Sequence, residues 1–126
     1  MGPTIVSNIR DVGQKSGAIY IGRGEGERGI YGNPFTCGQN DPFGRVACIR
    51  KFMDYFWRRM KEDVQFNLKV QQLKGKELLC WCAPLPCHGE VYAVYLDNDC
   101  NILKTQNIIE TRLNSWLHIQ GFQGDL

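Results

Sequence analysis

A short apolar strand that leads into a proline-stiffened turn and then a helix constrains the fold of this chain more than any other stretch. Leu78 and Leu79 belong to the apolar run, and residues 91–96 can continue as a helix. Between them, residues 80–90 read CWCAPLPCHGE and bring three thiols, an imidazole and a carboxylate into one turn. A strand followed closely by a helix is typical of α/β domains. So many reactive groups in one turn indicate chemistry, metal binding or ligand binding there.

Other β-rich and helix-periodic segments alternate along the chain. β-rich runs predict strands, and apolar residues spaced three and four apart predict helices. The predicted strands are residues 4–8, 18–21 and 77–81, and the predicted helices are about residues 44–60, 62–73, 89–96 and 102–119. Asp41 and Pro42 offer a start for the first long helix. Val64 and Leu68 mark the apolar side of the second helix.

This alternation predicts a single α/β domain over residues 1–126. We expect a small, mainly parallel, Rossmann-like sheet covered by helices, with an added C-terminal helix at about residues 102–119. A chain of 126 residues is long enough for one hydrophobic core. Sheets of this kind gather ligands at the carboxyl ends of their strands, so the site is expected at that edge.

Composition limits the partners and the location of the protein. The net charge of +2 does not support nucleic-acid binding, which needs a dense basic face. No signal-peptide pattern opens the sequence, and no apolar run approaches the roughly 18 residues of a membrane span, so we expect a cytoplasmic protein without membrane association. The six cysteines are unevenly spaced and are expected to be reduced thiols. Those outside the turn, Cys37, Cys48 and Cys100, are interpreted as buried or incidental.

Polar residues that follow the predicted strands are expected to meet the cysteine turn at one edge of the sheet. Asn8 and Arg10 follow the first strand, and Gly22 and Arg23 follow the second. The N–H groups at the start of the helix after the turn would face an anion, which arginine would neutralise. We therefore expect a site for a nucleotide-type or other small phosphorylated ligand. Its predicted ligand-binding residues are Asn8, Arg10, Gly22, Arg23, Asn33, Cys82 and Gly89.

Two alternatives remain open for the same turn. In the first, the chain is a thiol-dependent enzyme acting on a nucleotide or nucleic-acid component, with Cys87 as nucleophile, His88 as base and Glu90 as orienting acid. In the second, zinc stabilises an interaction module, although four ligands within nine positions are more crowded than in most zinc clusters. The zinc ligands would be Cys80, Cys82, Cys87 and His88. No other cofactor is expected.

The same motifs resemble a known family. The sequences IGR at residues 21–23, GNPF at 32–35 and GKELLCWCAPLPCHGE at 75–90 resemble the family called domain of unknown function 4326. The similarity covers about residues 5–96, and Glu90 stands where that family often has an acid. The family occurs in bacteria and bacteriophages. The resemblance therefore implies an intracellular protein that a phage can encode. In a phage, binding of a small phosphorylated ligand would suit a sequestering or regulatory role.

The chain departs from the family pattern in two places. Between Arg23 and Gly32 it carries a glycine-rich, charged insertion, whose N–H groups and arginines are suited to wrapping an anion. Beyond the family-like region it adds the helix at about residues 102–119. We expect the apolar face of this helix to complete the core of the same chain, and homo-oligomerisation through that face is the alternative.

Overall fold

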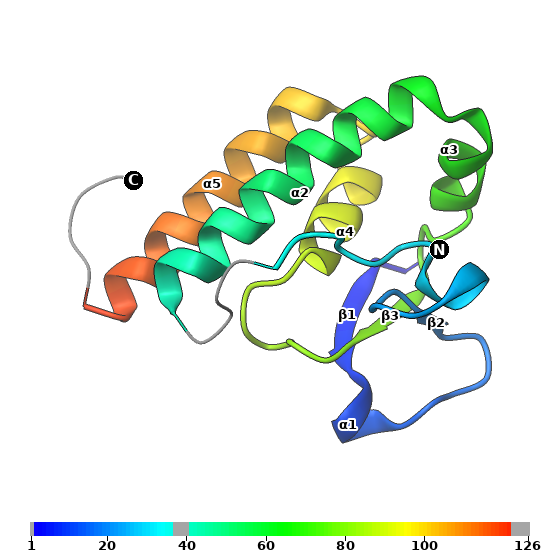
Figure 1. Ribbon diagram of the computed structural model, residues 1–126, viewed down its shortest axis with the longest axis horizontal. Helices are drawn as coiled ribbons and strands as arrows, with labels where there is room; N and C mark the ends of the chain where they lie inside the picture. The colour runs from blue at the N-terminus through cyan, green and yellow to red at the C-terminus, as the bar shows by residue number, and fades with distance from the viewer. Residues whose placement is uncertain (1, 37–40, 122–126) are drawn as a thin grey trace.

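Three short strands form one parallel sheet in the computed structural model, which describes residues 2–36 and 41–121. The strands are β1 (Ile5–Asn8), β2 (Ile19–Tyr20) and β3 (Glu77–Cys80), and they lie in the order β1-β3-β2. All three run in the same direction, so their carboxyl ends share one edge of the sheet (Figure 1). The predicted small parallel sheet is therefore confirmed.

The central strand, β3, is buried on both of its faces. Leu78 and Leu79 point to opposite sides of the sheet, as successive strand residues do, and both are fully buried. A central strand of a parallel sheet needs apolar side chains on both sides, which explains the unbroken apolar run in the sequence. Pairing with β2 extends one residue further, because the Ile21 N–H donates to the Leu79 carbonyl at 2.9 Å.

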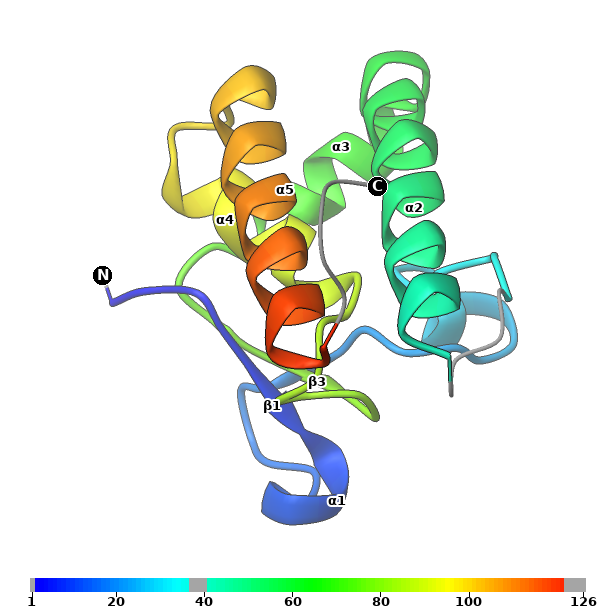
Figure 2. The same ribbon diagram turned by 90° about the vertical axis from the view of Figure 1, so that its left-hand side faces the viewer.

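Helices cover the sheet in two layers. Figures 1 and 2 show α4 between the sheet and the neighbouring pair α2 and α5, and α4 contacts both β1 and α5. The α-helices are α1 (Ile9–Val12), α2 (Pro42–Glu62), α3 (Val64–Gln71), α4 (Gly89–Asp97) and α5 (Ile102–Ile119), and a 3-10 helix, η1, spans Gly26–Gly29. The α/β class and the added C-terminal helix are confirmed.

Polar side chains cap the N-termini of α2, α3 and α5. The Asp41 carboxylate accepts from the Phe43 N–H at 3.2 Å, and the Asp63 carboxylate accepts from the Phe66 N–H at 3.0 Å. Asn101 accepts from the Lys104 N–H at 2.9 Å at the start of α5. Each cap satisfies a backbone donor that has no partner inside its helix.

Aromatic side chains form the centre of the core between α2 and α4. Phe52 and Phe56 come from α2 and meet Tyr92 of α4, with ring centroids 5.5 and 5.1 Å from the tyrosine ring. The apolar face predicted for α2 is buried except for Trp57, which is partly buried. Its buried residues include Val46, Ile49, Phe52, Met53, Phe56 and Met60.

The prediction for the buried side of α3 is wrong. Val64 and Leu68 are 68% and 55% exposed, whereas Phe66 and Val70 are buried. The Asp63 cap fixes where α3 begins, and Phe66 then faces Phe56 with ring centroids 6.2 Å apart. The larger phenylalanine buries more apolar surface than valine, and this determines the rotation of the helix. Sequence periodicity also missed the short helices α1 and η1, and Cys37 lies outside the described residues.

The helix α5 completes the core from the outside of α2 and α4. Ile109, Leu113 and Leu117 are buried. An ion pair joins α5 to α2, because the Arg50 guanidinium donates to both carboxylate oxygens of Glu110 at 2.6 to 3.1 Å. The apolar face of α5 is therefore covered by its own chain. Within the described residues, no helix has both the length and the apolar composition to cross a membrane.

Truncation of a buried residue in α5 tests this packing. Leu113→Ala is expected to lower the free energy of unfolding by about 3 kcal/mol, because Leu113 is 1% exposed and its removal leaves a cavity. Leu103→Ala, on the same helix but 74% exposed, serves as the control and is expected to change it by less than about 0.5 kcal/mol. Urea denaturation measures both. Equal effects of the two variants would contradict a docked α5.

Candidate functional site

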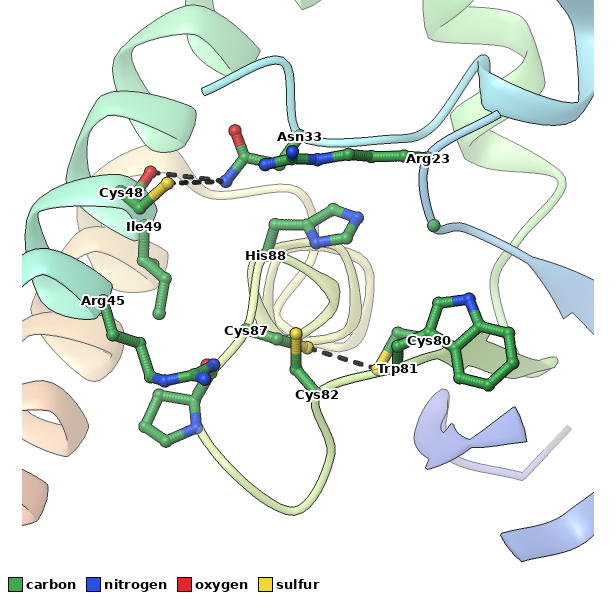
Figure 3. Close-up of a pocket in the computed structure, with 12 residues that line it drawn as sticks. Arg23, Asn33, Arg45, Cys48, Ile49, Cys80, Trp81, Cys82, Cys87 and His88 are labelled. Carbon is green, nitrogen blue, oxygen red and sulfur yellow. Dashed lines mark hydrogen bonds between the residues drawn. The ribbon is translucent and has the colours of Figure 1, made fainter. Parts of the chain in front are cut away.

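A cavity of about 250 Å³ lies where the strands end. Its walls come from the segments after β2 and β3, the first turns of α2 and the residues that lead into α4 (Figure 3). The lining residues are Gly22, Arg23, Asn33, Arg45, Cys48, Ile49, Cys80, Trp81, Cys82, Pro86, Cys87 and His88. The cavity thus brings together most of the predicted site. The predicted residues Asn8, Arg10, Gly89 and Glu90 are not among those that line it.

Two hydrogen-bonded aromatic residues, Trp81 and Tyr20, lie at one side of the site, and Trp81 lines the cavity. The Trp81 indole N–H donates to the Tyr20 hydroxyl at 3.1 Å, and that hydroxyl donates to the Arg23 carbonyl at 2.7 Å. A Cβ on Gly22 would lie 2.4 Å from the Tyr20 oxygen, so only glycine permits this arrangement. Trp81 remains 51% exposed beside the cavity.

Arg23 and Asn33 lie together on the wall opposite the cysteine turn (Figure 3). The Arg23 guanidinium donates to the Phe35 carbonyl, and the Asn33 side-chain oxygen accepts from the Phe35 N–H at 2.9 Å. The Asn33 amide donates to the Cys48 carbonyl at 3.4 Å. These bonds fix the loop that carries Asn33 against α2. Of the two arginines at the charged insertion, Arg23 at its start lines the cavity. Arg28 within it stacks over the Tyr20 ring, with its guanidinium carbon 4.1 Å from the ring centroid.

Asn8 holds the cysteine turn in place from outside the cavity. Its amide donates to the carbonyls of Trp81 at 3.1 Å and Ala83 at 2.9 Å. Its side-chain oxygen accepts from the Arg10 N–H at 2.9 Å and so caps α1. The end of β1 is therefore fastened to the turn after β3. Asn8 acts here as a positioning residue, and Arg10 is exposed on α1.

The Cys80 and Cys87 sulfurs lie 3.6 Å apart in the wall of the cavity. A hydrogen bond from Cys87, helped by the Ala83 N–H at 3.4 Å, lowers the pKa of Cys80 to about 6 against the opposing effect of burial. The same interaction, together with burial, raises the pKa of Cys87 well above that of an ordinary thiol. We expected the stabilised thiolate at Cys87. The pKa shifts favour the thiolate at Cys80 instead, because Cys80 has the larger number of hydrogen-bond donors.

The His88 imidazole is buried and neutral at physiological pH. Its Nε2 lies 2.7 Å from the Ile21 carbonyl oxygen, and its ring packs edge-on against Phe52 with centroids 5.1 Å apart. Burial lowers the pKa of His88 from 6.5 to about 4, and the charge of Arg23 acts in the same direction. A neutral ring so close to a carbonyl carries its proton on Nε2, which leaves Nδ1 as an acceptor. His88 therefore carries no positive charge at neutral pH.

Gly89 and Glu90 serve the packing of α4 instead of facing the cavity. A Cβ on Gly89 would lie 2.7 Å from Ile21 Cδ1 and 3.0 Å from Val6 Cγ1, so glycine lets the helix approach the sheet. The Glu90 N–H donates to the Cys87 carbonyl at 3.1 Å. Burial raises the pKa of Glu90, and Arg112 of α5 opposes that rise. Gly89 therefore lets α4 approach the sheet, and it does not line the cavity as a point of ligand approach. The pKa of Glu90 depends on α5 as well as on burial.

The four predicted zinc ligands are not arranged around a common point. Within the described residues, no group of three or more cysteine, histidine, aspartate or glutamate side chains is placed so that it could hold a metal ion. Cys80 and Cys87 meet each other, but His88 directs Nε2 to the Ile21 carbonyl. The described residues therefore contain no ligand cluster of the kind that the zinc hypothesis requires.

Sequence reasoning missed the contribution of α2 to the site. Three residues on the side of α2 that faces the cavity line it: Arg45, and one helical turn later Cys48 and Ile49. The Arg45 guanidinium donates to the Pro86 carbonyl at 3.0 Å, which connects α2 to the cysteine turn. The sequence spacing could have indicated this contribution, because Arg45 stands four residues before Ile49, a core residue, and so lies on the same side of the helix. An arginine at that position faces inward with its apolar neighbours.

The fold and the cavity define a small parallel α/β domain with a thiol-rich candidate site at the carboxyl ends of its strands. The chain belongs to the family described as Domain of unknown function (DUF4326), whose model matches residues 7–98. This confirms the resemblance seen in the motifs, and the matched region ends before α5.

The chain is also similar to part of a bacteriophage protein. The chain is 38% identical over 53 residues to the "Uncharacterized 12.4 kDa protein in nrdA-td intergenic region" of Enterobacteria phage T4. The aligned part is 42% of this chain and 49% of that protein, so the chain spans about half the length of the relative. No solved structure matches the chain significantly.

A titration of the thiolates tests the order of the two cysteines. The ultraviolet absorbance of thiolates, taken as the difference between the native protein and Cys80→Ser, is expected to rise with a midpoint near pH 6. In Cys87→Ala the midpoint of Cys80 is expected to move upward, because its principal hydrogen-bond donor is lost. A midpoint for Cys80 near the ordinary value of about 8.5 would contradict this assignment.

The buried imidazole makes stability depend on pH in a defined window. Above pH 6.5 His88 is neutral in both folded and unfolded chains, whereas between 6.5 and about 4 only the unfolded chain binds the proton. The free energy of unfolding is therefore expected to fall by about 3 kcal/mol across that window through this residue. His88→Gln keeps an N–H donor and removes the titration, so its urea-denaturation curve should lose this part of the pH dependence. An unchanged dependence would contradict the burial of a neutral ring.

Proposed function

We propose that the cavity binds a nucleotide-type or other small phosphorylated ligand. The observation that carries the proposal is the pairing of two arginines with an exposed aromatic residue around one hollow. Arg23 and Arg45 reach the cavity from different elements, and Trp81 also lines it. Guanidinium groups match the geometry of phosphate oxygens, and an indole face stacks on a planar base.

The electrostatics of the cavity favour an anion. The charge of Arg23 helps to lower the pKa of the neighbouring His88, so its field acts within the buried part of the site. Arg45 adds a second positive charge, while His88 stays neutral at physiological pH. The Cys80 thiolate contributes one negative charge, which the two arginines outweigh. Charge-assisted hydrogen bonds from such groups are stronger than neutral ones, which suits recognition of a phosphate.

The size of the cavity narrows the ligand class. Its volume of about 250 Å³ lies just below the roughly 300 to 1,000 Å³ of typical ligand pockets. The ligand is therefore of mononucleotide size or smaller, and a dinucleotide would extend beyond the walls. A small domain that holds such a ligand without a second domain is suited to sequestering or sensing it, and the similarity to a phage protein is consistent with a regulatory role in a phage.

A thermal-shift and calorimetry panel tests the proposal. Mononucleotides, cyclic nucleotides and sugar phosphates are tested against the full chain, and ADP-ribose-like compounds, which exceed the cavity, test the size limit. A binding compound is expected to raise the melting temperature, and Arg23→Ala is expected to weaken its affinity at least tenfold, because a charge-assisted bond contributes about 1.5 to 3 kcal/mol. Arg58→Ala removes an equal charge from the exposed side of α2 and is the control. The proposal fails if no compound binds, or if both variants lose affinity equally.

A second candidate function, a thiol-dependent enzyme acting on a nucleotide or nucleic-acid component, is favoured by one observation. The lowered pKa of Cys80 places a nucleophilic thiolate in the wall of the same cavity as His88. In this version Cys80 takes the role first assigned to Cys87, and His88, which is neutral at physiological pH, is the base. Mass spectrometry of the same incubations separates the two functions, since turnover through Cys80 passes through a covalent adduct that simple binding lacks.

A further inference from the structure

The two closest thiols in the site come from separate elements that the fold brings into contact. Cys80 is the last residue of β3, and Cys87 lies two residues before α4. Their sulfurs are 3.6 Å apart, as drawn in Figure 3. A disulfide needs a sulfur separation of about 2.05 Å, so the atoms have to approach by only about 1.5 Å. Both cysteines line the cavity, which is the route for a small reagent to side chains that are only 1% and 4% exposed.

The surroundings of the two thiols differ in a way that gives them separate roles. The Ala83 N–H donates to the Cys80 sulfur at 3.4 Å, whereas either sulfur can donate in the hydrogen bond between the two thiols. The backbone donor favours the thiolate at Cys80, and Cys87 is then the donor between two side chains that are 1% and 4% exposed. The thiolate is the form that attacks an oxidant, and a neighbouring thiol resolves the product. Cys80 is accordingly the attacking group, and Cys87 is the resolving group.

The segment between the two cysteines has room to adjust. Pro84 and Leu85 are exposed, whereas the two ends of the segment are fixed. The Asn8 amide holds the Ala83 carbonyl, and Arg45 holds the Pro86 carbonyl. The exposed middle of this segment is therefore the part of the chain that can yield as the two sulfurs approach.

We propose that Cys80 and Cys87 form an oxidisable dithiol that a peroxide converts into an intramolecular disulfide. The Cys80 thiolate attacks one peroxide oxygen, so an S–O bond forms and the O–O bond breaks. The departing hydroxide takes up the proton that the Cys80 thiol had released and leaves as water. The Cys87 sulfur then attacks the sulfenic sulfur, an S–S bond forms, and the hydroxyl group leaves with the Cys87 proton as a second water. Peroxide is reduced, and the protein loses two hydrogen atoms.

This inference does not depend on the proposed ligand, since every step uses only the two thiols and the oxidant. The other described cysteines have different surroundings. The Cys48 thiol donates to the Phe35 carbonyl at 3.1 Å, and the Cys100 thiol donates to the Gln71 side-chain oxygen at 3.6 Å. Cys82 also lines the cavity and is the nearest competitor in sequence. The experiment therefore has to identify which sulfurs become linked.

Peptide mapping after oxidation provides the test. The full chain is reduced, treated with hydrogen peroxide, blocked with N-ethylmaleimide and digested. The expected product is a peptide pair linked through Cys80 and Cys87, lighter by two hydrogen atoms and restored by dithiothreitol. Cys100→Ser, which keeps a hydroxyl donor toward Gln71, is the control and should form the same link. A link through Cys82 or another cysteine, or no link at peroxide levels that oxidise a free thiol peptide, would overturn the proposal.

Two variants separate the attacking thiol from the resolving thiol. In Cys87→Ala, which preserves an apolar side chain in the buried position, oxidation is expected to stop at the Cys80 sulfenic acid, and dimedone should trap it. In Cys80→Ser, Cys87 is expected to show no dimedone adduct. Circular dichroism verifies that both variants are folded. If either is not, Cys82→Ala provides a second test, because it should form the Cys80–Cys87 link as the native protein does. Trapping at Cys87 in place of Cys80 would refute the assigned roles.

Discussion

A hydrogen bond between the His88 imidazole and the Ile21 carbonyl connects the parts of this molecule that form the cavity. Ile21 continues β2, His88 stands at the start of α4, and the ring of Phe52 from α2 packs against the imidazole. The bond holds three elements that are distant in sequence at one place. Burial of the His88 imidazole lowers its pKa and keeps it neutral, so the positive charge of the cavity comes from arginine. Packing and the electrostatic character of the site therefore have the same origin.

The fold was largely predictable because its elements are regular. The apolar spacing along α2 and α5 and the short β-rich runs gave the helices and strands to within a few residues. The rotation of α3 was not predictable from periodicity, since Val64 and Leu68 offer the same spacing as the residues that are buried. A helix of eight residues carries too few apolar positions to define one face. Its orientation depends on Phe66 meeting an aromatic ring of α2, which is a tertiary contact.

The site was predictable in location but only partly in its details. Parallel strands bring their carboxyl ends together, so Gly22, Arg23 and the cysteine turn meet as expected. The roles of Asn8 and Gly89 could not be derived, because each depends on which neighbouring atoms lie within a few ångströms. The order of the two thiols depends on hydrogen-bond direction and burial in the same way. Residue type and spacing indicate that a site exists, whereas individual contacts assign the function of each side chain.

The helix α5 has a consequence for how this family can vary in length. The family model ends at residue 98, and α5 begins at Ile102. Even so, Ile109, Leu113 and Leu117 of α5 are integral to the hydrophobic core. Without this cover, the outer surfaces of α2 and α4 would therefore expose apolar side chains to water and favour association. A shorter member of the family must shield the equivalent surface with polar substitutions, another segment or a second molecule, so its solubility and assembly are tied to where its chain ends.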